Sequence, residues 1–430
     1  MATAAPDIES THVDQSYGGP VPIDQADRLD VTQPELYAEH RWHAPFRELR
    51  ERGGIYRCEN GRFGPYWSIS TYRPIVHVES LPKVYSSSWQ LGGITVVGDP
   101  EVLVEGEVRM PMFIAMDPPQ HTAQRRTVAP AFTPSEIERM KADCQARTAA
   151  VLDALPTATR FDWVERVSIE LTTGMLAKLF DFPWAERHNL TRWSDVLGDI
   201  ELFDTLENRQ FRLGNAFEMG GAFKQLWDRK AADGGGHDLI SIMLRSDAMS
   251  HMDEGEFMGN LILLIVGGND TTRNSMTAYA YGLDKHPAER TKLEGDPALI
   301  PNAVSELIRW QTPLSHMRRT AMEDTEVEGQ RIAKGDKLAL WYLSANRDET
   351  VFGEDADILR VDRPNARRHL AFGHGIHRCV GARLAELQIS TLLNEMAKRR
   401  MRVNVVGEPE RVSACFVHGY KKLPVEITRY

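Results

Sequence analysis

The residues with the clearest chemical potential are a cysteine and the glycines around it, in the stretch FGHGIHRCVGAR at positions 372–383. Gly373 and Gly375 precede Cys379, and a helical pattern of leucines follows it. Cys379 should therefore lie where a loop enters a helix, and the N–H groups and positive dipole of a helix N-terminus favour a thiolate. The glycines let the backbone approach something flat and bulky.

Two other interpretations of this cysteine stay open from the residues alone. A free cysteine is most often a small, buried residue of the core. Alternatively, His374, His377 and Cys379 could bind zinc, although zinc takes about four ligands in proteins and the rest of the sequence offers no partner pair.

A second unusual stretch, GGNDTT at positions 267–272, lies within a long helix that the sequence predicts from about Asp253 to Asp284. Glycine, asparagine and threonine are poor residues for a helix interior, and threonine hydroxyls can bond to the preceding turn and bend the helix. A polar, weakened turn in an apolar helix is typical of a place where a local rule is broken for function. Taken alone, the pattern also fits a buried turn whose polar groups satisfy one another.

The cysteine stretch resembles the cysteine-ligand loop of the cytochrome P450 superfamily, F-G-x-G-x-H-x-C-x-G. It matches that loop at Phe372, Gly373, Gly375, His377, Cys379 and Gly381. The stretch at 267–272 is similar to the oxygen-activation motif of the superfamily, (A/G)-G-x-(D/E)-T-(T/S). The resemblance implies a mainly α fold with a small β-rich region, and a haem b between the long central helix and the cysteine loop. Cys379 would be the axial thiolate ligand of the haem iron, which favours O–O cleavage. Asp270 would relay protons, and Thr271 would hold dioxygen and an ordered water.

The resemblance also extends to residues that would contact the haem. A helix is expected to open near residue 118 with Asp117 as its N-cap, and it would place His121 and Arg125 on one face. These two residues fall where the superfamily contacts the haem propionates, and a guanidinium can bind a carboxylate through two hydrogen bonds. Without the resemblance, a solvated basic face of the helix explains them equally. The expected cofactor contacts are His121, Arg125, Gly267, Gly268, Arg319, Phe372, Gly373, His377 and Gly381.

Glu306 and Arg309 lie three residues apart on a predicted helix opened by Pro301. Most ion pairs of this spacing are solvated and contribute little to stability. In the superfamily the E-x-x-R pair is internal and holds the core beside the cysteine loop, and Arg363 is the expected third member here. The resemblance therefore implies a structural role for this trio.

The segments that would face a substrate contribute mainly apolar residues. Residues 82–111 form a long stretch with several glycines, which is typical of a lid or binding loop, although a plain surface loop explains it equally well. The expected substrate contacts are Leu91, Ile94, Val96, Val97, Leu263, Val266, Leu314, Met317, Phe416 and Val417. Such a lining favours a hydrocarbon, and no cationic anchor for a carboxylate can be placed from the sequence.

Composition and charge place these motifs in an ordinary globular protein. The chain has 430 residues and a formal net charge of −10, which argues against nucleic acid as a general partner. Its four cysteines have no disulfide-framework spacing, which suits a cytoplasmic location. We expect a flexible arm over residues 1–30, without the apolar core of a membrane anchor, and a single domain over residues 31–430.

Within the superfamily, residues 63–68, 112–119 and 264–276 are similar to the bacterial terminal alkane and fatty-acid hydroxylases. The resemblance implies a monooxygenase that takes electrons from a ferredoxin and its reductase and hydroxylates the terminal carbon of medium-chain alkanes or fatty acids. An acidic ferredoxin would dock on Arg367, Arg368, His374 and Arg378; the alternative is a solvated loop or arginines in internal pairs. The other functions to consider are oxidation of terpenes or other cyclic substrates, peroxide-driven chemistry, and haem binding or sensing without turnover. The Asp270–Thr271 pair argues against the peroxide-driven class.

Overall fold

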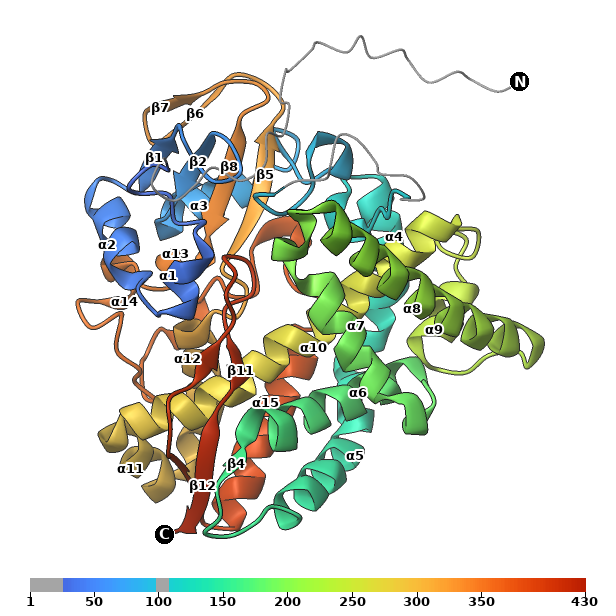
Figure 1. The fold of residues 1–430 in the computed structure, drawn as a ribbon, viewed down its shortest axis with the longest axis vertical. Helices are drawn as coiled ribbons and strands as arrows, with labels where there is room; N and C mark the ends of the chain where they lie inside the picture. Colours follow the sequence, from blue (N-terminus) through green and yellow to red (C-terminus); the bar gives the residue numbers. More distant parts are fainter. Residues whose placement is uncertain (1–25, 98–107) are drawn as a thin grey trace.

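The chain folds around one long central helix, α10 (Glu254–Lys285), as a computed structural model that describes residues 26–97 and 108–430 shows (Figure 1). Asp253 caps this helix, because its side chain accepts a hydrogen bond from the N–H of Glu256 at 2.8 Å. The observed bounds lie within one residue of the predicted ones. The helix continues without a break through residues 267–272, so its polar turn does not interrupt it.

Helices surround α10 on several sides, and α6, α7, α8, α12 and α15 all pack against it. In chain order the other helices are α1 (Pro34–Ala38), α2 (His43–Glu51), α3 (Tyr72–Glu79), α4 (Gln120–Val128), α5 (Pro134–Asp153), α6 (Glu170–Phe180), α7 (His188–Gly198), α8 (Leu206–Ala232), α9 (Leu239–Leu244), α11 (Pro287–Gly295), α12 (Ile300–Gln311), α13 (Tyr342–Ala345), α14 (Glu349–Phe352) and α15 (Ala382–Lys398). The mainly α fold expected from the sequence is therefore confirmed.

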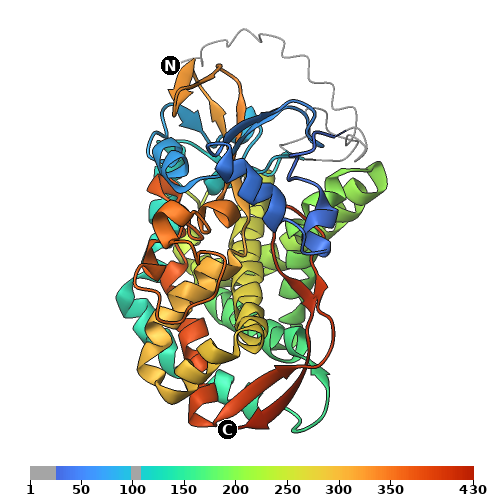
Figure 2. The same cartoon turned by 90° about the vertical axis from the view of Figure 1, so that its left-hand side faces the viewer.

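The β structure forms small sheets at opposite ends of the molecule (Figure 1 and Figure 2). The largest sheet has the strand order β1-β2-β8-β5-β3, in which only the β2–β8 pair is parallel, and a three-stranded sheet has the order β4-β12-β9. The strand pairs β6-β7 and β10-β11 form two further antiparallel sheets. The strands are β1 (Ile55–Cys58), β2 (Tyr66–Ile69), β3 (Tyr85–Ser86), β4 (Phe161–Asp162), β5 (His316–Ala321), β6 (Thr325–Val327), β7 (Gln330–Ile332), β8 (Lys337–Trp341), β9 (Met401–Val405), β10 (Glu410–Arg411), β11 (Tyr420–Lys422) and β12 (Pro424–Arg429).

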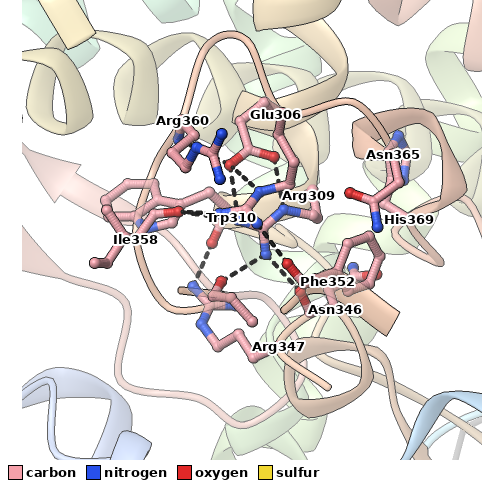
Figure 3. A network of polar contacts seen from close by, with 12 residues as sticks. Glu306, Arg309, Trp310, Asn346, Arg347, Phe352, Ile358, Arg360, Asn365 and His369 are labelled. Atoms are coloured by element: carbon pink, nitrogen blue, oxygen red, sulfur yellow. Dashed lines mark hydrogen bonds and ion pairs between the residues drawn. The ribbon is translucent and has the colours of Figure 1, made fainter. Parts of the chain in front are cut away.

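A buried ion-pair network joins α12 to the irregular segment that precedes the cysteine loop (Figure 3). Arg309 donates to both carboxylate oxygens of Glu306 at 2.7 and 2.8 Å, and to the carbonyl of Asn346 at 2.6 Å. Arg363 Nε donates to the same carboxylate at 3.0 Å. The three charged side chains are at most 1% exposed, so the pair is internal and its charges have the partners that burial requires.

The expected N-terminal arm, residues 1–30, lies mostly outside the described residues. Leu29 and Asp30, at its end, are buried, and the Asp30 carboxylate accepts a hydrogen bond from the Tyr66 hydroxyl at 3.0 Å. Packing thus begins slightly before residue 31. Among the described residues, no helix combines the length and the apolar character needed to cross a membrane.

Candidate active site

A cavity of about 380 Å³ lies between the central helix and the cysteine loop. Gly267, Gly268 and Thr271 line it from α10, and Phe372 and Cys379 line it from the loop. The space beside Gly267 is open, because a Cβ added there would meet no atom within 4 Å. The two motifs found in the sequence, more than a hundred residues apart, therefore form opposite walls of one cavity.

The cysteine loop presents its thiol to this cavity. Gly373 and Gly375 have φ angles of +67° and +65°, which strongly favour glycine, and the N–H of Cys379 donates to the carbonyl of Phe372 at 2.8 Å. Helix α15 begins at Ala382, so Cys379 lies at the predicted junction of loop and helix. Cys379 is exposed, and it lines the cavity.

The other three cysteines, Cys58, Cys144 and Cys415, are at most 5% exposed and lie outside the cavity. Burial raises the pKa of each of these thiols. Burial also raises the pKa of Cys379, but the N–H of Gly381 and the Arg125 guanidinium oppose the shift there. Coordination to a metal ion would deprotonate this thiol. Cys379 is therefore the cysteine placed to bind a group in the cavity, and Cys415, in the core beside the larger sheet, is not.

One side of the cavity carries an excess of hydrogen-bond donors. Arg125, Arg319 and His377 line it, and the ring of His121 lies 4.2 Å from the ring of His377, centroid to centroid. None of the four nitrogens of these two rings has a hydrogen-bond partner among the described residues. Burial and the nearby arginines lower the pKa of His121 to about 4 and that of His377 to about 2.

Buried polar atoms without partners are rare in proteins, so this cluster fits a ligand that accepts hydrogen bonds and carries negative charge. A haem has these properties, since two carboxylates extend from a flat, apolar ring that holds iron. The residues present therefore fit a haem, with Cys379 on one wall and the donor cluster at the edge. Within residues 26–97 and 108–430, no group of three or more histidine, cysteine, aspartate or glutamate side chains could hold a bare metal ion such as zinc.

On the opposite wall, Asp270 belongs to a polar network with Ser194 and Arg273, and Thr271 is the next residue of α10. The Asp270 carboxylate accepts a hydrogen bond from Ser194 Oγ at 2.7 Å and lies 3.0 Å from Arg273 Nη2. Burial raises the pKa of Asp270 to about 6, and Arg273 opposes the shift. The Thr271 hydroxyl lines the cavity and donates to the carbonyl of Gly267 at 3.0 Å. The network can therefore hold a proton beside the cavity near neutral pH.

Seven of the expected substrate contacts line the cavity: Ile94, Leu263, Val266, Leu314, Met317, Phe416 and Val417. Leu91, Val96 and Val97, which were also expected, are not among the residues that line this cavity. Leu91 is 38% exposed, and Val96 and Val97 pack with the core beside the larger sheet. The N–H of Val96 donates to His316 Nε2 at 3.2 Å. Residues 98–107 of the expected binding loop lie outside the described residues.

Other lining residues were not among the expected contacts, although the resemblance implies that the helices around residues 197–205 and 211–227 cover the cavity. Leu197, Ile200 and Phe203 line the cavity from the end of α7 and the segment that follows it. Arg212 of α8 also lines it, and donates to the carbonyls of Val196 and Asp199 at 2.8 and 3.0 Å. Glu79, at the end of α3, reaches the same cavity from a distant part of the chain. The amphipathic pattern of these helices predicts burial, but it cannot indicate which buried face meets a cavity.

Comparison with known proteins gives concordant results. Residues 298–400 match the family model described as Cytochrome P450. Linalool 8-monooxygenase of Pseudomonas putida is 34% identical over 93% of this chain and 98% of its own length. A methyl-branched lipid omega-hydroxylase of Mycobacterium tuberculosis is 30% identical over 84% of this chain and 83% of its own.

Two solved structures are more similar in sequence. CYP153D17 from Sphingomonas sp. PAMC 26605 is 66% identical, with a TM-score of 0.88, and the alignment covers 94% of this chain and 100% of that one. Cytochrome P450-153 from Novosphingobium aromaticivorans is 56% identical, with a TM-score of 0.89, over 93% of this chain and 99% of that one.

Proposed function

The chain belongs to the cytochrome P450 family, and from this membership we propose that it hydroxylates the terminal carbon of medium-chain alkanes or fatty acids. Membership makes it a haem-containing monooxygenase of hydrophobic substrates. The observation that carries the finer proposal is the apolar lining of the cavity that Cys379 also lines, with Leu263 and Val266 from α10, and Ile94, Met317 and Phe416 from other parts of the chain. The similarity to solved cytochromes of the 153 group and to an omega-hydroxylase supports attack at a chain end.

In this proposal Cys379 binds the haem iron, and His121, Arg125, Arg319 and His377 hold the haem carboxylates. Haem, once bound, supplies the activation of O₂. The Thr271 hydroxyl, which faces the cavity, orients dioxygen and an ordered water by hydrogen bonding.

The proton comes from Asp270 in this proposal. Its raised pKa lets a fraction of its carboxyl groups carry a proton at neutral pH, which is the property a general acid needs. Arg273 connects Asp270 to Asp195, whose carboxylate lies 2.7 Å from Arg273 Nη1 and whose side chain is 50% exposed. The ion pairs thus connect Asp270 to a half-exposed carboxylate at the surface. Because a guanidinium does not release its proton, water that reaches Asp270 would replace the proton it donates.

Binding should tighten with chain length if burial of a linear chain supplies the affinity. Each added methylene contributes about 0.8 kcal/mol, so Kd should fall about fourfold per carbon until the cavity is full. The measurement is a titration of n-alkanes and fatty acids of increasing length, scored by the optical change on displacing water from the site. Gas chromatography of the products should show mainly primary alcohols or ω-hydroxy acids. Mostly subterminal alcohols would contradict the proposal.

Terpenes are the second candidate substrates, favoured by the 34% identity to linalool 8-monooxygenase. Turnover of terpenes or steroids with no turnover of linear chains would decide for this alternative. Consumption of NADPH that depends on the substrate, in the presence of a ferredoxin pair, would separate either enzyme from a haem protein without turnover.

We further propose that a negatively charged ferredoxin, reduced by its reductase in the cytoplasm, delivers the electrons at the cysteine loop. Arg367, Arg368 and Arg378 are exposed there, and none of them forms an ion pair with another described residue. All four cysteines are free, as a reducing compartment would keep them. A cationic patch on an otherwise acidic protein steers an anionic partner, and salt weakens the attraction.

Reversing the charge of this patch should slow reduction by the ferredoxin. We expect Arg367→Glu with Arg368→Glu to lower the second-order rate at least about tenfold at low ionic strength, and the wild-type rate to fall as salt is added. Stopped-flow reduction kinetics measure both effects. The control is Lys421→Glu with Lys422→Glu, two exposed positions near the C-terminus that give the same change in net charge. Rates insensitive to salt and to the first double variant would contradict this docking site.

A further inference from the structure

Glu79 makes an unusual set of contacts for a carboxylate that no motif singled out. It is the last residue of α3, it is 4% exposed, and it lines the cavity. Its side chain accepts three hydrogen bonds: from the Tyr342 hydroxyl at 2.5 Å, from Arg319 Nη2 at 2.9 Å and from the backbone N–H of His374 at 2.8 Å. One carboxylate therefore joins α3, α13, β5 and the cysteine loop.

The contact with the loop falls in the turn that leads to Cys379. His374 lies between Gly373 and Gly375, the two residues with positive φ, so Glu79 binds the centre of the turn. The backbone interlocks at the same place, since a Cβ added to Gly375 would lie 2.3 Å from the carbonyl oxygen of Glu79. The end of α3 and the cysteine loop therefore cannot move independently without breaking this contact.

The contact with Glu79 holds the Arg319 guanidinium in one orientation at the cavity wall. Arg319 Nη2 donates to Glu79, and its Nη1 donates to the carbonyl of Arg318 at 2.8 Å. The side chain of Arg319 is 4% exposed and that of Glu79 is 1% exposed. Glu79 is the only acidic partner of Arg319 among the described residues. Removal of one partner from a buried pair leaves the other charge uncompensated, which is strongly unfavourable.

We propose that Glu79 is a positioning residue for the haem site: it orients Arg319 toward a haem carboxylate and holds the turn that presents Cys379. This inference rests on the proposed haem-thiolate assignment of Cys379. Glu79 also places a negative charge beside the haem pocket, and such a charge disfavours the gain of an electron there. Its loss should therefore affect both the retention of the haem and its reduction potential.

The test compares Glu79→Gln with wild type in the haem-loaded protein. Glutamine keeps the size of the side chain and can still accept from Tyr342 or His374, but it carries no charge. We expect haem release to excess apomyoglobin to become about tenfold faster, the change expected from losing one charge-assisted hydrogen bond. We expect the reduction potential to become more positive, and part of the ferrous–CO band to move away from its thiolate position.

Two further variants separate positioning from a general loss of stability. Glu395→Gln removes another buried carboxylate, which lies on α15, pairs with Lys398 and Arg399 and is not among the residues that line the cavity. This variant should leave haem release and potential unchanged. In an Arg319→Gln background the effect of Glu79→Gln on haem release should shrink, because both act through the same contact.

The results expected for Glu79 and for the haem assignment differ. If Glu79→Gln folds poorly, Tyr342→Phe removes one of the three hydrogen bonds without changing charge and should accelerate haem release in the same direction. If both variants keep the wild-type release rate and potential, the inference about Glu79 is wrong while the haem assignment stands. If wild type itself shows no thiolate-type ferrous–CO band, the haem-thiolate assignment fails and the inference fails with it.

Discussion

Replacement of Cys379 with serine should abolish the strongly red-shifted Soret band of the ferrous–CO protein, together with monooxygenase activity. The red shift requires a thiolate opposite the CO, and a serine hydroxyl stays protonated and is a poor ligand for iron. Cys379 is the one cysteine among the described residues that lines the cavity. The measurement is the difference spectrum of the reduced protein with and without CO.

The controls are Cys58→Ser, Cys144→Ser and Cys415→Ser. These residues lie in the packed core, so each change places a hydroxyl where a thiol was buried and can lower thermal stability. The red-shifted band should nevertheless persist in all three variants, because none of these sulfurs reaches the cavity. Survival of the band in Cys379→Ser, or its loss only in Cys415→Ser, would refute the assignment of Cys379 as the ligand.

Removal of the Thr271 hydroxyl should uncouple electron consumption from hydroxylation. Thr271→Ala should keep haem and substrate binding, since alanine is a better helix former than threonine and the hydroxyl contacts only the Gly267 carbonyl within the described residues. Most reducing equivalents should then appear as hydrogen peroxide. Parallel assays of NADPH, peroxide and alcohol product measure the coupling.

Asp270→Asn should slow turnover about 10²-fold and increase the solvent isotope effect, because a positioned acid typically contributes this much to a proton transfer. Asparagine can still accept from Ser194, so the fold of the network is retained. Thr277→Ala serves as the control in α10. Its hydroxyl bonds to the Arg273 carbonyl and to Ser168 Oγ, neither residue lines the cavity, and its loss should leave coupling unchanged. Wild-type coupling in Thr271→Ala together with wild-type turnover in Asp270→Asn would exclude the relay.

Signals confined to a short stretch of chain gave reliable predictions. The predicted central helix from Asp253 to Asp284 agrees with the observed one to within a residue. Residues 133–136, Thr-Pro-Ser-Glu, form a capping-box pattern, which predicts that a helix starts there. Helix α5 does begin at Pro134, although the Thr133 hydroxyl does not cap it and donates instead to the carbonyl of Pro130 at 3.1 Å. Helix starts and glycine turns depend on neighbouring residues, so the chain encodes them locally.

Asp117 illustrates where a local signal fails. It was expected to cap the helix that carries His121 and Arg125, but its side chain accepts from the Ser86 hydroxyl and from the N–H of Ser87 at 3.0 Å. The helix begins at Gln120 instead, with no side-chain cap. The Asp117 carboxylate binds Ser86 and Ser87, about thirty residues away in the chain, instead of the helix N-terminus. The capping rule considers only neighbouring residues and cannot predict such a partner.

The sequence by itself was enough to identify the cysteine loop, the polar turn of the central helix and, from these two motifs, the family. Each motif consists of a few residues that are close together in the chain. Only the tertiary structure decided what surrounds them. Glu79 meets Tyr342 across 263 positions of sequence, and Ser194 meets Asp270 across 76. Val96 packs in the core beside the larger sheet, and its N–H donates to His316, 220 residues away. Such contacts depend on how the helices and the sheet pack in three dimensions, and the periodicity of a helix or strand records only that one of its faces is buried.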